Sequence, residues 1–282
     1  MTLPVLAIAA KDFEDAARSK LLWGLTLVLL VVTVPSFHSL LHSPFIDGAV
    51  DAAEWLPGAF ENYVAPLAMI AAYRSVVGER ESGSLRVLFG HPVTRRDLVA
   101  GKVLGRAALV ALVLLITTLG LGIAVVAVYG TLPIALFVVS ALYVMAYGAV
   151  WAAVTVGVSA AVTSRLQAIA GMLGLFLLFG PFQLWQGIAL PLAALALTGS
   201  ASTASISQID PTTWPAWYPY VQRLNPIQNF VHSREFVASL GDPSIGYLGE
   251  LRLQLFGLAV LLAWAFVPLA LGYWRFERAD LA

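Results

Sequence analysis

Cysteine is absent from this 282-residue sequence, and charged residues are scarce. Without cysteine, the chain can form neither disulfides nor thiolate metal sites. Asp, Glu, Lys and Arg together make up 11% of the residues, whereas ordinary soluble domains carry about 25%. The formal net charge is zero, so the chain lacks the excess of positive charge typical of proteins that bind nucleic acid. The composition therefore excludes an ordinary soluble domain and argues against nucleic acid as a partner.

Apolar residues dominate the chain instead. They account for 60% of it, and the mean hydropathy is +0.84. Long apolar runs recur along the whole length, and about 20 helical residues cross a hydrocarbon core of roughly 30 Å. The sequence therefore predicts an all-α polytopic membrane protein with a single transmembrane domain over residues 1–282. Six spanning helices are expected, at about 21–41, 56–77, 103–129, 133–162, 166–197 and 252–274.

The positive charges predict the orientation. Residues 1–20 and 74–106, with Arg165 and two C-terminal arginines, hold 13 of the 16 Lys and Arg residues on one side of a six-span arrangement. Such residues stay cytoplasmic because translocating them is unfavourable. We therefore expect a protein of the plasma membrane with both termini in the cytoplasm.

The N-terminal segment, residues 1–20, is amphipathic. Apolar residues such as Ile8 and Phe13 follow helical spacing, while Lys11 and Asp15 occupy the other side. The expected structure is a helix lying along the inner membrane surface. A cleaved signal peptide is the alternative, but the sequence after the first apolar run lacks an A-x-A-like cleavage site.

The fifth apolar run is too long for one span and too short for two. As one helix it would extend about 46 Å, whereas two spans need about 40 residues and a turn. Pro181 and Pro191 interrupt it. We expect one long, kinked helix that projects beyond the outer membrane surface.

Residues 78–102 gather eight of the chain's 32 charged residues. Thr94 and Asp97 form a capping-box pattern, which predicts that a helix begins at Arg95 and runs into the third span. Pro92 disfavours helix just before it. A short separate element is therefore expected from Ser82 to Gly90.

That short element carries an apolar face. Leu85, Leu88 and Phe89 lie at i, i+3 and i+4 of a helical turn. A face of this kind is typical of a segment that docks on a partner. The alternative is that residues 78–102 only anchor the inner side of the protein by their positive charge.

The segment resembles the type-2 ABC transporter permeases. The shared features are Glu79 and Glu81, Gly83-Ser84-Leu85, Pro92-Val93-Thr94-Arg95 and Gly101-Lys102. The start of the chain and the sequence RLNPIQNF at 223–230 are similar to the branch that contains the permease of the nitrous-oxide-reductase (Nos) maturation transporter. The resemblance implies that 78–102 is a coupling segment that docks a separate ATPase subunit. Its expected docking residues are Glu79, Glu81, Gly83, Leu85, Leu88, Phe89, Pro92, Thr94, Arg95, Arg96 and Asp97.

The chain has no phosphate-binding loop of its own. A G-x-x-x-x-G-K-[ST] pattern is required, but Gly101-Lys102 is followed by Val103, and Arg96 stands where the first glycine should be. We therefore expect no cofactor in this chain and no enzymatic activity. The resemblance implies that ATP and Mg²⁺ bind a partner ABC ATPase and that a second permease copy completes a dimer.

An outer segment, residues 199–251, is the one long region between predicted spans. Its aromatic residues Trp214, Trp217, Tyr218 and Tyr220 suit either lipid headgroups or an extracytoplasmic binding or maturation protein. Asn225 followed by Pro226 predicts a helix start.

Two further patterns are weaker. His38 and His42 stand at i, i+4 and could share a metal, although a pair of interfacial histidines is the simpler interpretation. Small residues recur every fourth position around Gly157 and at Gly101 and Gly105, which predicts close helix packing within the chain.

Two other functions compete with an ATP-driven permease. An intramembrane enzyme would need catalytic residues within the spans, where ionisable residues are nearly absent. A membrane anchor for an extracytoplasmic protein would need only the outer segment. Co-purification of an ATPase would separate the permease from both.

Overall fold

The computed structural model describes residues 4–88, 90, 92–182, 184–203, 214–246 and 249–279, with the backbone alone for Leu21, Arg86 and Val87. Phe89, which was predicted to dock the ATPase, therefore lies outside the described residues. So do residues 204–213 of the outer segment.

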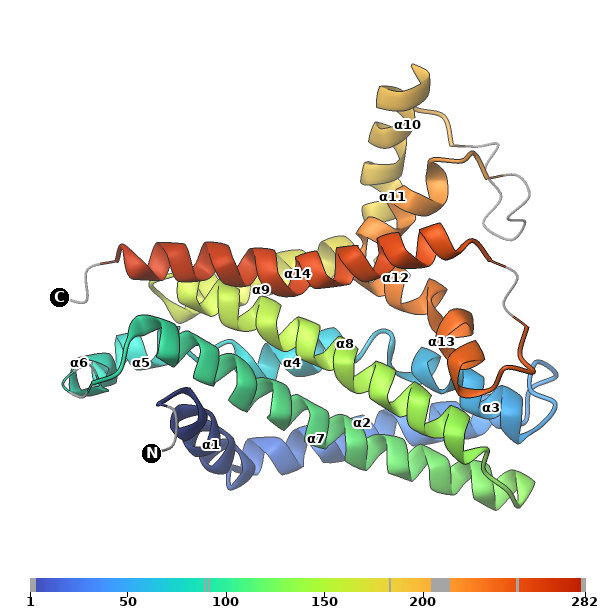
Figure 1. Cartoon of the computed structure of the whole chain (residues 1–282), viewed down its shortest axis with the longest axis horizontal. Helices are drawn as coiled ribbons and strands as arrows, with labels where there is room; N and C mark the ends of the chain where they lie inside the picture. Colours follow the sequence, from blue (N-terminus) through green and yellow to red (C-terminus); the bar gives the residue numbers. More distant parts are fainter. Residues whose placement is uncertain are drawn as a thin grey trace.

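Among the described residues, four helices are long and apolar enough to cross a membrane. They are α2 (Lys20–Leu41), α7 (Arg95–Tyr129), α8 (Ile134–Ala161) and α14 (Leu251–Glu277). They correspond to the first, third, fourth and sixth predicted spans and run roughly along the long axis of the molecule (Figure 1). The all-helical, polytopic class is confirmed.

The second predicted span is not one helix. The chain forms α3 (Ala49–Trp55), the 3₁₀ helix η1 (Leu56–Phe60) and α4 (Val64–Ala72), and then turns into α5 (Val77–Glu81). At 1.5 Å per residue, the nine residues of α4 extend only about 14 Å. Most of α4 is buried, so neighbouring helices cover the broken backbone, as a membrane requires.

The fifth predicted span is broken, and the expected continuous kinked helix was wrong. Helix α9 (Arg165–Phe179) ends at Gly180, and a π-helical turn, η2 (Trp185–Ala189), leads into α10 (Leu190–Thr198). The break falls at Gly180-Pro181. Pro191 lies in the first turn of α10, where proline is tolerated because its missing N–H has no partner there anyway. Helix α10 leaves the bundle crosswise to α9 (Figure 1).

Helix α1 (Pro4–Ala17) lies beside the start of α7. This end of the bundle, which we call the inner end, also holds α5, α6 (Ser84–Leu88) and the end of α14 (Figure 1). The described parts nearest the two termini are thus at one end of the molecule, as the charge distribution predicted. The opposite, outer end holds α3 and three short helices of the outer segment: α11 (Tyr218–Leu224), α12 (Pro226–His232) and α13 (Arg234–Gly241).

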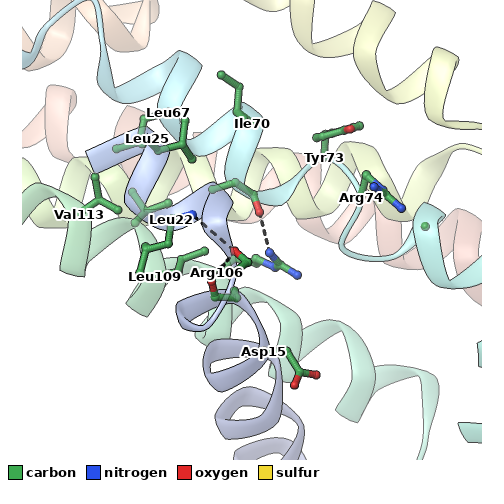
Figure 2. Close-up of a pocket in the computed structure, with 15 residues that line it drawn as sticks. Asp15, Leu22, Leu25, Leu67, Ile70, Tyr73, Arg74, Arg106, Leu109 and Val113 are labelled. Atoms are coloured by element: carbon green, nitrogen blue, oxygen red, sulfur yellow. Dashed lines mark hydrogen bonds between the residues drawn. The ribbon is translucent and has the colours of Figure 1, made fainter. Parts of the chain in front are cut away.

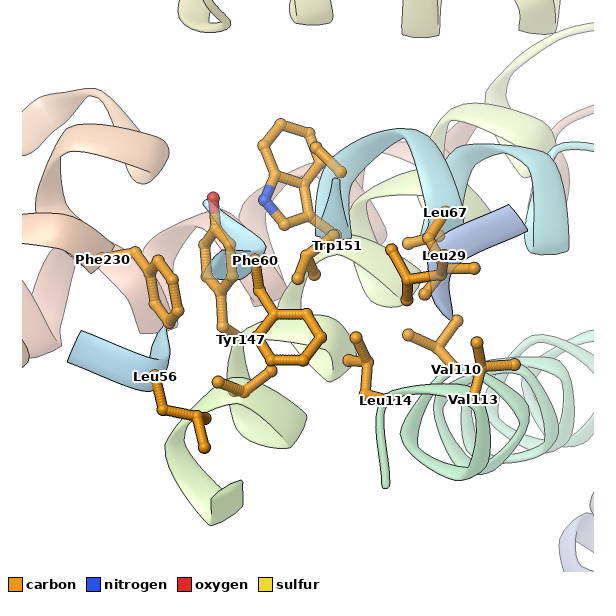
Figure 3. Close-up of a cluster of buried hydrophobic side chains, with 14 of the residues drawn as sticks. Leu29, Leu56, Phe60, Leu67, Val110, Val113, Leu114, Tyr147, Trp151 and Phe230 are labelled. Atoms are coloured by element: carbon orange, nitrogen blue, oxygen red, sulfur yellow. The ribbon is translucent and has the colours of Figure 1, made fainter. Parts of the chain in front are cut away.

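The largest core cluster lies between α2, α4, α7, α8 and α12 (Figure 3). Tyr147 and Trp151 of α8 are almost fully buried in it. Phe230 stacks on Tyr147, with ring centroids 4.1 Å apart. Because Phe230 belongs to α12, this contact anchors the outer segment to the membrane-spanning bundle.

Glycine lets α8 and α14 approach closely. A Cβ built on Gly157 would lie 2.5 Å from the carbonyl oxygen of Pro268, and one on Gly272 would lie 2.0 Å from that of Gly157. Larger side chains would push the two helices apart. The predicted use of the small residues around Gly157, packing within the chain, is confirmed.

Candidate functional site

The described part of the coupling segment, residues 78–102, comprises two short helices joined by a tight turn and the first turns of α7. Helix α5 ends at Glu81, and α6 begins at Ser84. Gly83 between them has φ +73°, a left-handed conformation that glycine adopts without steric cost. The exposed tip of the segment, Glu81 to Ser84, lies at this turn.

The predicted capping box begins α7. The backbone N–H of Asp97 donates to Thr94 Oγ1 at 3.1 Å, and the backbone N–H of Thr94 donates to Asp97 Oδ2 at 3.0 Å. Both bonds satisfy backbone donors that a helix start leaves open. Thr94 and Asp97 therefore mark where α7 begins within the coupling segment.

Arg95 faces inward, toward the end of α14. Its guanidinium donates to the backbone carbonyls of Glu277 at 2.7 Å and Ala279 at 3.0 Å, and it lies 5.4 Å from the centre of the Phe276 ring. Arg80 lies over the same ring at 5.3 Å. A cation at this position satisfies carbonyls that a helix end leaves open. Arg95 therefore binds the C-terminal end of α14, whereas Arg96 is exposed.

Leu85 and Leu88 of the short helix also face inward. Leu85 is only 2% exposed and packs in a cluster that includes Val76, Leu98 and Phe276. Leu88 is half-buried against the same cluster. The expectation that Leu85 presents an outward apolar face is corrected: its burial holds the segment to the bundle.

Glu79 and Glu81, the two acidic residues of α5, form ion pairs. Glu81 pairs with the Arg165 side chain, and its Oε1 accepts a hydrogen bond from the Arg165 backbone at 2.8 Å. Glu79 pairs with Lys102. Each acid thus joins α5 to a different helix, α9 or α7.

Lys102 belongs to a buried ion-pair cluster that reaches α1. Its Nζ donates to Asp12 Oδ1 at 2.7 Å. Arg106 contacts the other oxygen of Asp12 through Nε at 2.8 Å and donates to the Ala71 carbonyl at 2.8 Å. We call Asp12, Glu79, Lys102 and Arg106 the α1 ion-pair cluster. It connects α1, α5 and α7 through charges held largely away from water.

The sequence analysis missed Asp12. One signal could have revealed it: Asp12 lies at i+4 from Ile8 and i−4 from Ala16, in the middle of the apolar face of α1. A carboxylate there is costly to bury unless it is paired. An exposed pair, Glu14 of α1 with Arg18 just beyond it, lies at 3.9 Å.

Glycines on α7 let α1 pack directly against it. A Cβ on Gly101 would lie 2.7 Å from the Ile8 side chain, and one on Gly105 would lie 2.9 Å from the Ala9 carbonyl oxygen. The predicted amphipathic helix is confirmed, and the close packing predicted at Gly101 and Gly105 is the contact of this helix with α7.

In the outer segment, the predicted aromatic surface is largely packed. Tyr218 is buried, and its hydroxyl accepts a hydrogen bond from Gln222 at 2.6 Å. Trp214 and Trp217 are half-buried beside Tyr218, with ring centroids at 5.1 and 5.9 Å. Tyr220 packs on Phe256 at 5.1 Å. These aromatic residues therefore pack the outer helices together, and they do not form a purely exposed surface.

The Asn225-Pro226 helix start is confirmed. Asn225 Oδ1 accepts hydrogen bonds from the backbone N–H groups of Ile227 and Gln228, at 2.8 and 3.3 Å. Its Nδ2 donates to the carbonyl of Phe179 at 3.1 Å. One side chain thus begins α12 and ties it to the end of α9.

A buried arginine, which the sequence analysis did not single out, organises the rest of the outer helices. Arg223 donates to Ser233 Oγ at 2.8 Å, to Asn229 Oδ1 at 3.1 Å and to the His232 carbonyl at 3.1 Å. Asn229 in turn donates to the Gly257 carbonyl of α14 at 2.7 Å. We call Arg223, Asn225, Asn229 and Ser233 the outer polar network.

The two histidines of the metal hypothesis contact each other. Their ring centroids are 4.6 Å apart, and His42 Nδ1 lies 2.9 Å from the His38 carbonyl. Within the described part of the chain, no group of three or more His, Cys, Asp or Glu residues could hold a metal ion.

Comparison with known proteins agrees with this architecture. The family model described as ABC-2 family transporter protein matches residues 6–281. A relative from Pseudomonas aeruginosa, named "Probable ABC transporter permease protein NosY", is 28% identical over 296 residues, covering 99% of this chain and 100% of that protein. The protein of the same name from Stutzerimonas stutzeri is 28% identical over 124 residues, 43% of this chain and 44% of its own. The resemblance to the Nos branch is confirmed, and the chain belongs to the ABC-2 family of transporter proteins as a transmembrane permease.

Proposed function

We propose that this chain couples a separate ATPase subunit to transport across the plasma membrane, and that the ATPase docks on the coupling segment. Two permease copies and two ATPase subunits form the complex, with ATP and Mg²⁺ bound by the ATPase. The inner end of the bundle faces the cytoplasm.

One observation carries the proposal: the coupling segment is tied to four different helices. Glu79 reaches α7 and α1 through Lys102, Glu81 reaches α9, and Arg95 joins the start of α7 to the end of α14. A displacement of the exposed tip would therefore act on all four helices together. A segment that served only as a positive anchor would need none of these inward contacts.

The exposed tip provides the test. We expect Ser84→Trp to leave the chain inserted in the membrane while lowering the yield of co-purified ATPase about tenfold, because a bulky side chain blocks a close contact. Ser202→Trp, at an exposed serine of the outer segment, is the matched control and should retain the ATPase. Equal retention by both variants would place the docking site elsewhere, and absence of an ATPase from the unmodified preparation would favour a membrane anchor.

We also propose that the outer end binds an extracytoplasmic protein. Helix α10 projects from the bundle (Figure 1) with Leu192, Leu195 and Leu197 about half exposed or more. Leu192→Asn with Leu195→Asn should release such a protein while the ATPase stays bound. Loss of membrane insertion with unchanged partners would instead make α10 a lipid anchor.

A further inference from the structure

A cavity of about 490 Å³ opens between α1, α2, α4 and α7 at the inner end (Figure 2). Its volume falls in the range of about 300–1,000 Å³ that is typical of small-molecule sites. One side of it is apolar, with walls formed by Leu22, Leu25, Leu67, Leu109 and Val113. Arg74 and Asp15 lie away from these residues, and Arg106 lies between the two groups (Figure 2).

The two arginines differ in what they can bind. Arg106 already donates to Asp12 and to the Ala71 carbonyl. Arg74 is exposed, and within the described part of the chain its guanidinium forms no salt bridge and no hydrogen bond. Asp15 is likewise exposed and forms no salt bridge with the described residues. The cavity therefore offers one available cation and one available acceptor next to an apolar wall.

The cavity lies at the depth of the membrane surface. Trp23, which is 60% exposed, follows Leu22 on α2, and the exposed residues Leu27 and Val28 continue toward the middle of that helix. Exposed tryptophan is enriched where headgroups meet hydrocarbon. The polar side thus lies at headgroup level, while the apolar side leads along α2 into the hydrocarbon.

We infer that this cavity binds a phospholipid of the inner leaflet whose headgroup carries a hydrogen-bond donor. Arg74 pairs with the lipid phosphate by charge-assisted hydrogen bonds. Asp15 accepts from the hydroxyl of phosphatidylglycerol or the ammonium of phosphatidylethanolamine. The upper part of an acyl chain lies against the leucines. Phosphatidylcholine has a phosphate but no such donor, so it binds less tightly.

The test is titration of the full-length chain in detergent with each of the three lipids, followed by native mass spectrometry. Phosphatidylglycerol and phosphatidylethanolamine should bind more tightly than phosphatidylcholine. Arg74→Gln should weaken binding of all three about tenfold. Asp15→Leu, which removes the acceptor, should remove the preference among them. Equal binding of the three lipids to the unmodified chain would overturn the proposal.

Arg18→Gln is the matched control, since it removes the same charge from an exposed position on the same end of the molecule. It should change binding by less than about twofold. If it weakens binding as much as Arg74→Gln, the effect is general surface charge and the proposed site is wrong. Ile70→Trp provides a second variant, because Ile70 is 45% exposed in the cavity wall. The tryptophan ring should fit at this exposed position and occupy the space of the acyl chain, so that binding of all three lipids falls.

Two other occupants give different results. If sn-glycerol 3-phosphate competes as well as intact lipid, the cavity is a soluble phosphate site and the lipid proposal fails. In this cysteine-free chain, Ile70→Cys reports a second copy. Disulfide-linked dimers in native membranes would mean that another permease covers the cavity, which would also overturn the proposal.

Discussion

The two ends of this permease are held by different interactions. At the inner end, charged side chains from distant segments pair with one another: Asp12, Lys102 and Arg106 in α1 and α7, with Glu79 of α5 beside them. At the outer end, Arg223 donates to neutral acceptors within a span of about ten residues, and one ion pair, Arg234 with Glu54 at 3.9 Å, joins α13 to α3. The inner end therefore depends chiefly on charge balance between separate helices, whereas the outer end depends chiefly on local hydrogen bonds, with one ion pair between α3 and α13.

That difference suits the proposed roles. Ion pairs between helices keep α1, α5 and α7 together when an outside force acts on the coupling segment. The outer polar network instead fixes three short helices against α14, where the backbone at Gly257 comes close enough to accept from Asn229. Four predictions test whether the two ends are stabilised in these different ways.

Asp12→Ala should have the largest effect. It leaves Lys102 and Arg106 without their shared buried carboxylate, a change that costs about 3–5 kcal/mol in other proteins. We expect loss of most folded chain, measured by thermal unfolding in detergent. Glu14→Ala, on the exposed pair of the same helix, should cost less than about 1 kcal/mol. Similar losses of stability from both variants would mean that the α1 ion-pair cluster stabilises the chain no more than an exposed ion pair does.

Arg223→Leu should have a smaller effect. Its acceptors, on Asn229, Ser233 and His232, would lose a donor at a buried site, which costs about 1–3 kcal/mol. The same unfolding measurement checks this. Arg252→Leu removes an exposed arginine at the start of α14 and should change stability by no more than about 0.5 kcal/mol. If Arg223→Leu lowered stability more than Asp12→Ala does, the outer end would depend more strongly on its buried charge than the inner end.

His232 should make the outer end sensitive to acid. Burial, and then the charges of Arg223 and Arg234, lower the pKa of His232 to about 4, well below the ordinary histidine value of about 6.5. The unfolded chain therefore binds this proton more readily, so stability is complete above about pH 6.5 and falls as the pH drops toward 4. Melting temperatures across this range should show the decline, and His232→Gln should flatten it. An unchanged slope in the variant would assign the decline to other groups.

Single cysteines should perturb the protein least. Ser82→Cys, at the tip of the coupling segment, and Ser202→Cys, in the outer segment, both replace exposed serines. A membrane-impermeant thiol reagent should label them from opposite sides. Labelling of both from one side would show that the two ends do not face different compartments.

How far the sequence could predict the structure depended on the distance between the interacting residues. The capping box at Thr94 and the start of α12 at Asn225 were predicted correctly, because each is decided by residues no more than three positions apart. The second and fifth spans were wrongly predicted as continuous helices. Hydropathy gives the extent of an apolar run, but it does not show whether the backbone continues as a helix throughout. The π turn before α10 has no signature in composition.

The membrane class, the gathering of positive charge at the inner end and the local helix starts are readable from the amino-acid sequence, since they follow from composition and short-range hydrogen bonding. What each candidate residue does depends instead on which helices the fold brings beside it. Leu85 and Arg95 face inward because α14 and α8 lie beside them. Asp12 is a partner of Lys102 because the fold brings together residues 90 positions apart. A carboxylate on an apolar face is unfavourable alone, and only a partner supplied by another helix makes it stabilising.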